Sequence, residues 1–241
     1  MLFILRGSRV DNRVKDNIAW IRKMITDAAL RRGRDPQSIR LMAVTKTVSD
    51  DRIHEALAAG IRLFGENYVQ EALRKIPLFP PELEWHMIGH LQTKKSKYAV
   101  RLFHALQSLD RVELAAELDK RCKGAGICMP VLVEVNIGGE ETKGGVSPQE
   151  LAGFIRAIAP LTNIAVQGLM TMPPWFDDPE RARPYFRLLR ELQGEIAALD
   201  IPNVAMSELS MGMSDDFVVA VEEGSTLVRI GRAIFGERPT A

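Results

Sequence analysis

The sequence predicts an α/β protein folded as a single (β/α)8 TIM barrel with an extra N-terminal helix. Short apolar runs alternate with helical patterns eight times along the chain, which is typical of parallel βαβ units. The length of 241 residues is close to that of such barrels. The proline-rich stretches 77–81 and 173–174 are too short to be linkers, so residues 1–241 are expected to form one domain.

The elements are expected in a regular order. Residues 10–32 have the spacing of an amphipathic helix that ends near Gly33 and Pro36. The runs expected as strands are 39–46, 62–65, 84–89, 102–106, 130–137, 164–170, 204–208 and 226–230. The helical patterns between and after them are 49–59, 66–76, 93–100, 111–122, 148–158, 179–199 and 214–223.

This alternation also fits an open doubly wound sheet. A nucleotide-binding sheet of that kind carries a glycine-rich turn after its first strand. Here Val44-Thr45-Lys46-Thr47 stands at that place. The count of eight strands and the short connections therefore favour the closed barrel.

Composition narrows the possible environment. The net charge is only +1, from 32 basic and 31 acidic residues. The overall charge of the protein therefore does not indicate binding to nucleic acid or to a membrane. Cys122 and Cys128 lack the CxxC spacing of a zinc site and are too few for a disulfide framework. The apolar start 1–5 is broken by Arg6 and Gly7, and no run has the length of a membrane span. A cytoplasmic protein is expected.

Lys46 is the residue whose position most clearly indicates a chemical role. It ends the first apolar run and precedes a polar turn, so a buried strand delivers its amine to the mouth of the barrel. Partial desolvation there lowers the pKa of a lysine and lets it carry a carbonyl cofactor as a Schiff base. From position alone, the alternative is a solvated lysine that merely caps the strand.

The last two strands are followed by residues suited to an anion. Ser214 precedes a helical pattern that it could cap, while neighbouring backbone amides point at a phosphate. Gly231 permits close backbone approach after the last strand, where barrels hold phosphate. The alternative is a simple N-cap and a turn glycine. Asp215 and Asp216 oppose an anion unless their side chains turn outward.

Three other motifs do not favour a further catalytic or metal site. His86 and His90 have the i, i+4 spacing of a zinc pair on a helix, but their segment is expected as strand plus loop, so a structural or supporting role is favoured and no metal is expected. Ser210 and Ser214 lack the G-x-S-x-G pattern of a hydrolase. The segment 138–145 is expected as a solvated loop, with a lid as the alternative.

Several segments together resemble the pyridoxal phosphate homeostasis protein family over about residues 10–238. They are VTKT at 44–47, FGENYVQEAL at 64–73, WHMIGHLQ at 85–92, VEVNIGGEETKGG at 133–145, GLMTMPP at 168–174, LSMGMSDDF at 209–217 and GSTLVRIGRAIFGER at 224–238. This family is similar in its barrel to the N-terminal domain of bacterial alanine racemase.

The resemblance implies a cofactor, pyridoxal 5'-phosphate (PLP), held as a Schiff base on Lys46. It also implies that Asn67 lies beside PLP, that Ser214 and Gly231 hold its phosphate, and that Arg229 faces the pyridine nitrogen. For Arg229 the alternative is a surface ion pair.

One departure from similar sequences is Arg232, which stands where a small hydroxyl residue often follows RIG. Arg232 lacks the hydroxyl group for a side-chain contact with the phosphate at this position. The alternative is that Arg232 itself makes a charge-assisted hydrogen bond to the phosphate.

Three functions fit a lysine that carries a carbonyl group. They are a non-catalytic PLP carrier in intracellular PLP homeostasis, a PLP-dependent racemase or decarboxylase, and a PLP-free aldolase-like barrel. A racemase needs a second acid/base from a further domain, and this chain is expected to lack it: it ends at Ala241, and its tyrosines, Tyr68, Tyr98 and Tyr185, are not expected at strand ends. The carrier is therefore favoured, as a monomer, with PLP-accepting apoenzymes as candidate partners.

Overall fold

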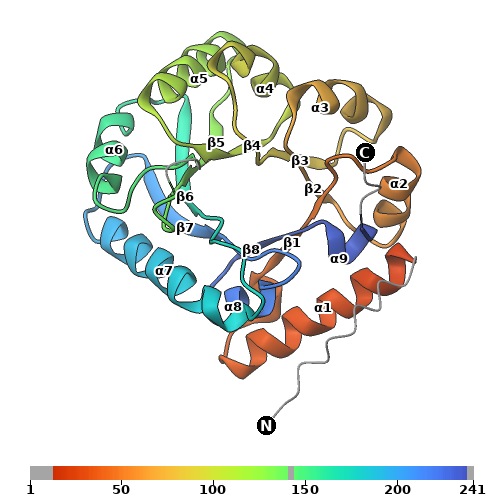
Figure 1. Cartoon of the computed structure of the whole chain (residues 1–241). Helices are drawn as coiled ribbons and strands as arrows, with labels where there is room; N and C mark the ends of the chain where they lie inside the picture. The colour runs from red at the N-terminus through yellow and green to blue at the C-terminus, as the bar shows by residue number, and fades with distance from the viewer. Residues whose placement is uncertain (1–12, 141–143, 238–241) are drawn as a thin grey trace.

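The computed structural model describes residues 13–140 and 144–237 and contains a closed barrel of parallel strands in the order β1 to β8 (Figure 1). This confirms the predicted fold class. The strands are β1 Arg40–Val44, β2 Leu63–Glu66, β3 Glu84–Met87, β4 Ala105–Leu109, β5 Met129–Glu134, β6 Ile164–Met170, β7 Val204–Ser210 and β8 Leu227–Ile230.

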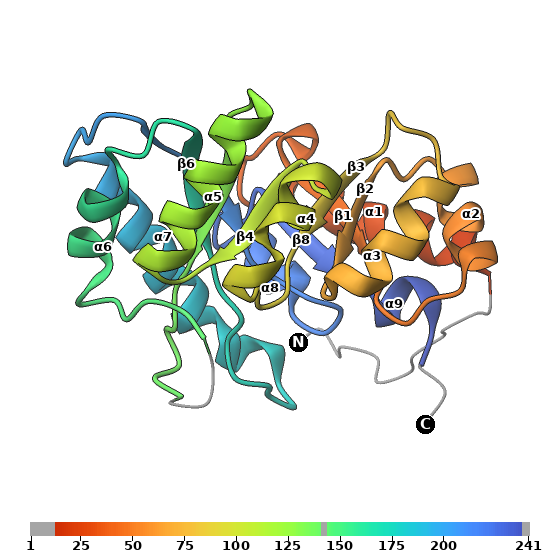
Figure 2. The same cartoon turned by 90° about the horizontal axis from the view of Figure 1, so that it is seen from above.

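Helices surround the barrel on the outside, as Figures 1 and 2 show. The α-helices are α1 Val14–Arg31, α2 Asp50–Ala58, α3 Val69–Lys75, α4 Ser96–Leu102, α5 Val112–Ala125, α6 Leu151–Ile158, α7 Arg183–Ala197, α8 Phe217–Glu222 and α9 Arg232–Phe235. Short 3-10 turns are η1 Pro36–Ser38, η2 Ile76–Leu78, η3 Thr93–Lys95 and η4 Pro179–Ala182.

The extra helix α1 precedes the first strand, as predicted. Its apolar positions Val14, Ile18, Ile21 and Ile25 are buried. Figure 1 shows α1 along the outside of the barrel between α8 and α2, where it packs on both and on the short α9. The expected residues 10–12 of this helix lie outside the described residues.

The fourth strand was predicted at 102–106, and this was wrong by three residues. Leu102 still belongs to α4, and the strand runs from Ala105 to Leu109. The prediction followed the apolar run and stopped before Gln107 and Ser108, which are polar but fully buried in β4. Ser108 was expected beyond the strand end, yet it lies inside β4 and donates to Gly89 O.

Two apolar clusters show which way the strand residues face. The large cluster lies between barrel and helices and includes Trp85, Met87, Val228 and Ile230. A small separate cluster fills part of the barrel interior with Met42, Val44, Leu63, Ile88 and Leu227. Because side chains alternate along a strand, residues between outward-facing neighbours point into the barrel.

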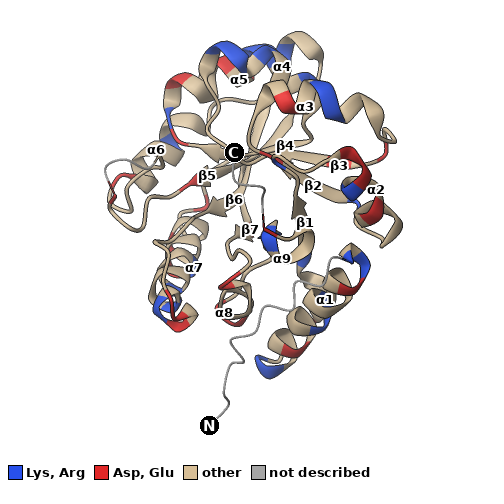
Figure 3. Cartoon of the chain, turned by 45° about the vertical axis from the view of Figure 1, so that its right-hand side comes forward, with Lys and Arg blue, Asp and Glu red and all other residues tan. Residues whose placement is uncertain are grey.

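The charges of the barrel lie mostly on its outer helices, where both signs are interspersed (Figure 3). Among the described residues, no helix is both long and apolar enough to cross a membrane. Cys122 is buried and Cys128 exposed, and each is a free cysteine.

Candidate functional site

The five residues predicted for the site line one cavity of about 210 Å³ at the carboxyl ends of the strands. Asn67 directly follows β2, Arg229 lies in β8 and Gly231 directly after it, and Ser214 lies in the segment after β7. Lys46 was predicted as the last residue of its strand, but β1 ends at Val44 and Lys46 lies two residues beyond it. A neighbouring cavity of about 240 Å³ is also lined by Lys46 and Gly231.

A buried lysine and its glutamate partner hold the backbone on the two sides of Lys46. The Nζ atom of Lys75, the last residue of α3, donates to Thr45 O at 2.5 Å. It also lies 3.0 Å from Glu66 Oε1 and 2.6 Å from Glu71 Oε1. The same Glu71 oxygen accepts the backbone N–H of Thr47 at 2.7 Å.

The turn that this network holds is strained. Thr47 has a φ of 61°, a left-handed conformation that β-branched residues rarely adopt. Thr45 adds bonds of its own, among them one from its N–H to Gly65 O at 3.0 Å and one from its hydroxyl to Glu66 Oε1 at 2.7 Å. The Lys75 network therefore stabilises the turn that presents Lys46. Sequence reasoning did not single out Lys75, because a lysine at the end of a helical pattern carries no local sign of burial.

Asn67 supplies a polar atom that the described protein leaves without a partner. Its Oδ1 is buried and makes no hydrogen bond within the described residues. Gly89, after β3, lets the chain approach closely here, because a Cβ at Gly89 would lie 2.4 Å from Asn67 O. A buried acceptor beside a cavity suits a ligand that brings a donor.

Ser214 does not cap the helix that follows it, so that prediction was wrong. Helix α8 begins at Phe217, and its N-cap position is occupied by Asp216. The Ser214 hydroxyl instead accepts the backbone N–H of Ala233 at 3.1 Å. This contact joins the segment after β7 to the segment after β8, on either side of the cavity.

The two aspartates that counted against an anion have their own partners. Asp215 forms an ion pair with Arg232, and Arg232 also lies 3.3 Å from Glu237. Asp216 does not turn outward, since its Oδ1 accepts the backbone N–H of Met213 at 2.6 Å. Arg232 therefore compensates the charge of Asp215 at the cavity wall.

Arg229 is buried within β8, with 4% of its surface exposed, so the alternative of a surface ion pair was wrong. Its Nη1 donates to Ser210 Oγ at 2.6 Å and its Nη2 to Thr171 O at 2.8 Å. Burial lowers the pKa of Arg229 to about 10, partly offset by Asp216 and Glu134, so the guanidinium remains charged at neutral pH.

Glu134 is a buried carboxyl at the end of β5 that sequence reasoning did not single out. Burial and the nearby Asp110 raise the pKa of Glu134 to about 7, while Arg229 lowers it. Alternation could have identified it, because the neighbouring Val133 and Val135 both pack in the outer core.

Replacing Glu134 with glutamine is expected to change how stability depends on pH. The pKa of Glu134 is raised from 4.5 to about 7 in the folded state, so between these values the folded protein holds a proton that the unfolded chain has released. The free energy of unfolding of the wild type should therefore fall by about 1–3 kcal/mol as pH rises through that window, because of Glu134. Urea unfolding at about pH 5 and pH 7.5 should show Glu134→Gln gaining stability relative to wild type at the higher pH.

The exposed Glu113 on α5 provides the matched control for this measurement. Glu113→Gln should keep the pH dependence of the wild type, because Glu113 lies on the helix surface. An unchanged pH dependence in Glu134→Gln would show that Glu134 does not titrate as its burial indicates.

The remaining motifs lie apart from one another. His86 is in β3, and His90 is in the exposed loop after it, as predicted. Within residues 13–140 and 144–237, no group of three or more His, Cys, Asp or Glu side chains is arranged to hold a metal ion. Residues 141–143 of the predicted loop 138–145 lie outside the described residues, so the lid alternative is untested.

Comparisons with known proteins agree with this barrel. The family model for the alanine racemase N-terminal domain matches residues 12–239. A pyridoxal phosphate homeostasis protein from Aquifex aeolicus (strain VF5) is 46% identical over 224 residues, 92% of this chain and 97% of that protein.

Solved structures show the same likeness. PipY from Synechococcus elongatus PCC7942 with PLP bound is 31% identical with a TM-score of 0.81, and the match covers 92% of this chain and 100% of PipY. An alanine racemase from Clostridium difficile 630 is 14% identical with a TM-score of 0.73, and the match covers 96% of this chain and 58% of that protein. That second likeness is one of fold alone.

Proposed function

Because the chain belongs to the pyridoxal phosphate homeostasis protein family, we propose that it binds PLP as a Schiff base on Lys46 and takes part in intracellular PLP homeostasis. The observation that carries this proposal is the shared cavity at the carboxyl ends of the strands. It combines an amine from Lys46 with the buried guanidinium of Arg229, and both come from sequence segments that resemble the family.

The residues around the cavity fit PLP. PLP supplies an aldehyde that condenses with an amine, together with a phosphate and a pyridine ring. Lys46 provides the amine, and the Lys75 network fixes the turn that carries it. Asn67 offers its Oδ1, which has no hydrogen-bond partner in the described part of the chain, beside the cofactor. Ser214 and Gly231 follow the last two strands, where barrels hold phosphate groups.

Arg229 would limit what PLP can do in this site. A guanidinium can only donate hydrogen bonds, so it leaves an acceptor such as the pyridine nitrogen unprotonated. An unprotonated ring is a weaker electron sink, which disfavours carbanion chemistry but leaves exchange of the Schiff base intact. Arg229 therefore favours exchange of the Schiff base over carbanion chemistry.

The lining of the cavity also favours a non-catalytic role. Among the described residues that line it there is no histidine, tyrosine or cysteine that could carry a second proton. Asp215 lines it but is paired with Arg232. Tyr68 lies two residues after β2, closer to a strand end than expected, but 57% of it is exposed and it is not among the lining residues.

Loading the purified protein with PLP tests this function. We expect visible absorbance typical of a protein-bound PLP Schiff base, and transfer of PLP to an added PLP-dependent apoenzyme, measured by recovery of that enzyme's activity. Incubation of the loaded protein with L-alanine and other L-amino acids should yield no D-isomer above the rate of free PLP. Turnover that Lys46→Ala abolishes would instead establish a PLP enzyme.

A further inference from the structure

The barrel interior contains a continuous series of hydrogen bonds that begins at Arg229. Arg229 Nη1 donates to Ser210 Oγ at 2.6 Å. The hydroxyl of Ser210 donates in turn to Gln107 Oε1 at 2.6 Å. Ser210 and Gln107 are both fully buried, although they lie on β7 and β4. A buried hydroxyl that accepts one bond and donates another has a defined direction.

The series continues to the opposite end of the barrel. Gln107 Nε2 lies 2.8 Å from Nδ1 of the buried His86, and His86 Nε2 lies 2.7 Å from Glu84 Oε1. The other carboxylate oxygen of Glu84 accepts from Arg40 Nη2 at 2.6 Å. Glu84 and Arg40 begin β3 and β1, so the series crosses the whole barrel.

The directions of these bonds determine the tautomer of His86. The amide oxygen of Gln107 accepts from Ser210, so its Nε2 is the atom that faces His86 and donates to Nδ1. Nδ1 is then unprotonated, and Nε2 carries the hydrogen that Glu84 accepts. Only the neutral Nε2–H form of His86 satisfies every bond.

A protonated His86 would reverse the middle of the series. Nδ1–H would then need an acceptor, which Gln107 supplies only by turning its amide over. The amide nitrogen would then donate to Ser210, whose own hydrogen would lose its acceptor. The change would therefore reach the bond between Ser210 and Arg229.

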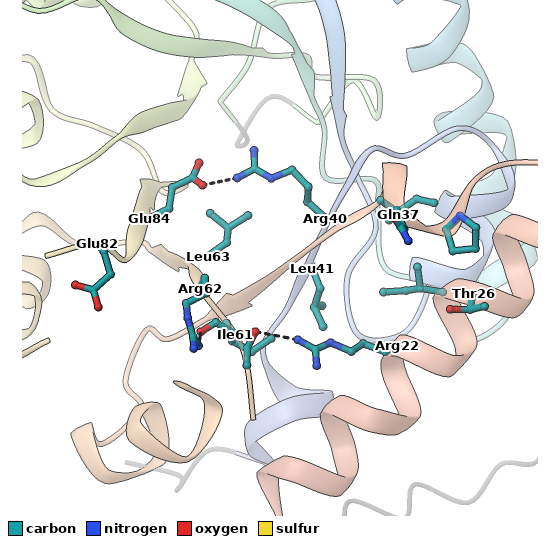
Figure 4. A pocket seen from close by; sticks show the side chains of 14 residues that line it. Arg22, Thr26, Gln37, Arg40, Leu41, Ile61, Arg62, Leu63, Glu82 and Glu84 are labelled. Atoms are coloured by element: carbon teal, nitrogen blue, oxygen red, sulfur yellow. Dashed lines mark hydrogen bonds and ion pairs between the residues drawn. The ribbon is translucent and has the colours of Figure 1, made fainter. Parts of the chain in front are cut away.

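The end of the series at Glu84 and Arg40 lies at the amino-terminal ends of the strands and opens into a cavity of about 540 Å³. Arg22 and Arg62 are among the other residues that line this cavity. Figure 4 shows the Arg40–Glu84 ion pair across this cavity. The side chains of Arg40 and Glu84 are 39% and 38% exposed, so solvent reaches this end while the middle is buried.

We propose that these six side chains form one polarised chain, and that through it His86 and Gln107 act as positioning residues for the guanidinium of Arg229. We call Arg229, Ser210, Gln107, His86, Glu84 and Arg40 the interior chain. The neutral Nε2–H form of His86 holds Arg229 in its present geometry. The last step, an effect on bound PLP, rests on the proposed function, whereas the state of His86 does not.

The charges around the two ends of the interior chain agree with this assignment. Burial lowers the pKa of His86, and the facing groups Arg40 and His104 lower it further, while Glu84 raises it. Hydrogen bonds from His86 and Arg40 hold the pKa of Glu84 at about 2, so Glu84 remains a carboxylate acceptor. Asp216 and Glu134 face Arg229 and favour its charged form.

The first test measures His86 directly, without PLP. In protein labelled with ¹⁵N-histidine, the ring signals at pH 7 that are lost in His86→Gln should report a protonated Nε2 and an unprotonated Nδ1. His54→Gln, on the exposed face of α2, removes a different ring and serves as the matched control. A His86 that is an imidazolium or an Nδ1–H tautomer at pH 7 would overturn the proposal.

The second test reverses one bond with a nearly isosteric change. In Gln107→Glu both side-chain oxygens accept, so His86 lies between two carboxylates and should become an imidazolium at pH 7. Ser210 keeps a carboxylate oxygen as its acceptor in this variant, so its bond with Arg229 should persist. The PLP dissociation constant should therefore stay close to that of the wild type, and borohydride should still fix PLP on Lys46. An unchanged neutral His86 in folded Gln107→Glu would contradict the polarised chain.

A pH titration of the wild type tests the positioning role, because protonation of His86 requires the Gln107 amide to turn over. The visible spectrum of the PLP-loaded protein should change with the same midpoint as the ¹⁵N signals of His86. A spectrum that does not respond as His86 titrates would overturn the positioning role. Failure to bind PLP at all would contradict the proposed function, while the NMR result would still decide the state of His86.

Discussion

Replacing Lys46 with alanine is expected to abolish covalent retention of PLP and the visible absorbance of the loaded protein. Lys46 is the lysine that lines the cavity at the carboxyl ends of the strands. Borohydride reduction of the wild type should fix the cofactor on the tryptic peptide of residues 41–52, in which Lys46 is the single lysine. Mass spectrometry of that peptide provides the measurement.

Lys120 offers the control, because it is exposed on α5, away from the strand ends. Lys120→Ala should retain both the absorbance and the label. A label on another lysine, or an unchanged absorbance in Lys46→Ala, would refute the assignment of Lys46. The apo form of Lys46→Ala should unfold at nearly the same urea concentration as wild type, so that the loss reports on chemistry and not on folding.

Replacing Lys75 with methionine is expected to lower the free energy of unfolding by about 3–5 kcal/mol, the cost of breaking a buried ion pair. The Lys75 side chain is 0% exposed and contacts two carboxylates. Burial already raises the pKa of Glu66, and loss of Lys75 would leave that carboxyl without its cation. Urea unfolding measures the change, and PLP retention should fall because the turn at Lys46 loses its support.

Two further variants separate these effects. Lys95→Met, at a partly exposed lysine that bonds to Gln70, should change stability by no more than about 0.5 kcal/mol. Adding Glu66→Gln to Lys75→Met should recover part of the lost stability, because it removes the unpaired charge. A Lys75→Met protein as stable as wild type would show that the buried pair is not needed.

Sequence patterns predicted local features well and polar partners poorly. The alternation of strands and helices is local, so it placed the barrel and the extra helix α1. The same reasoning misplaced β4, because buried Gln107 and Ser108 look like residues of a loop. It also took Ser214 for a helix cap, whereas its hydroxyl bonds to Ala233 on the neighbouring segment.

By itself, the sequence determined the order of the elements, the closed barrel, and the gathering of its five predicted site residues at the carboxyl end, namely Lys46, Asn67, Ser214, Arg229 and Gly231. Parallel strands with short connections require that gathering, because all their carboxyl ends face the same way. Only the tertiary structure decided which polar atoms meet inside the barrel. Partners such as Arg229 and Ser210 come from different strands, and their contact depends on strand register and tilt, which no local pattern encodes.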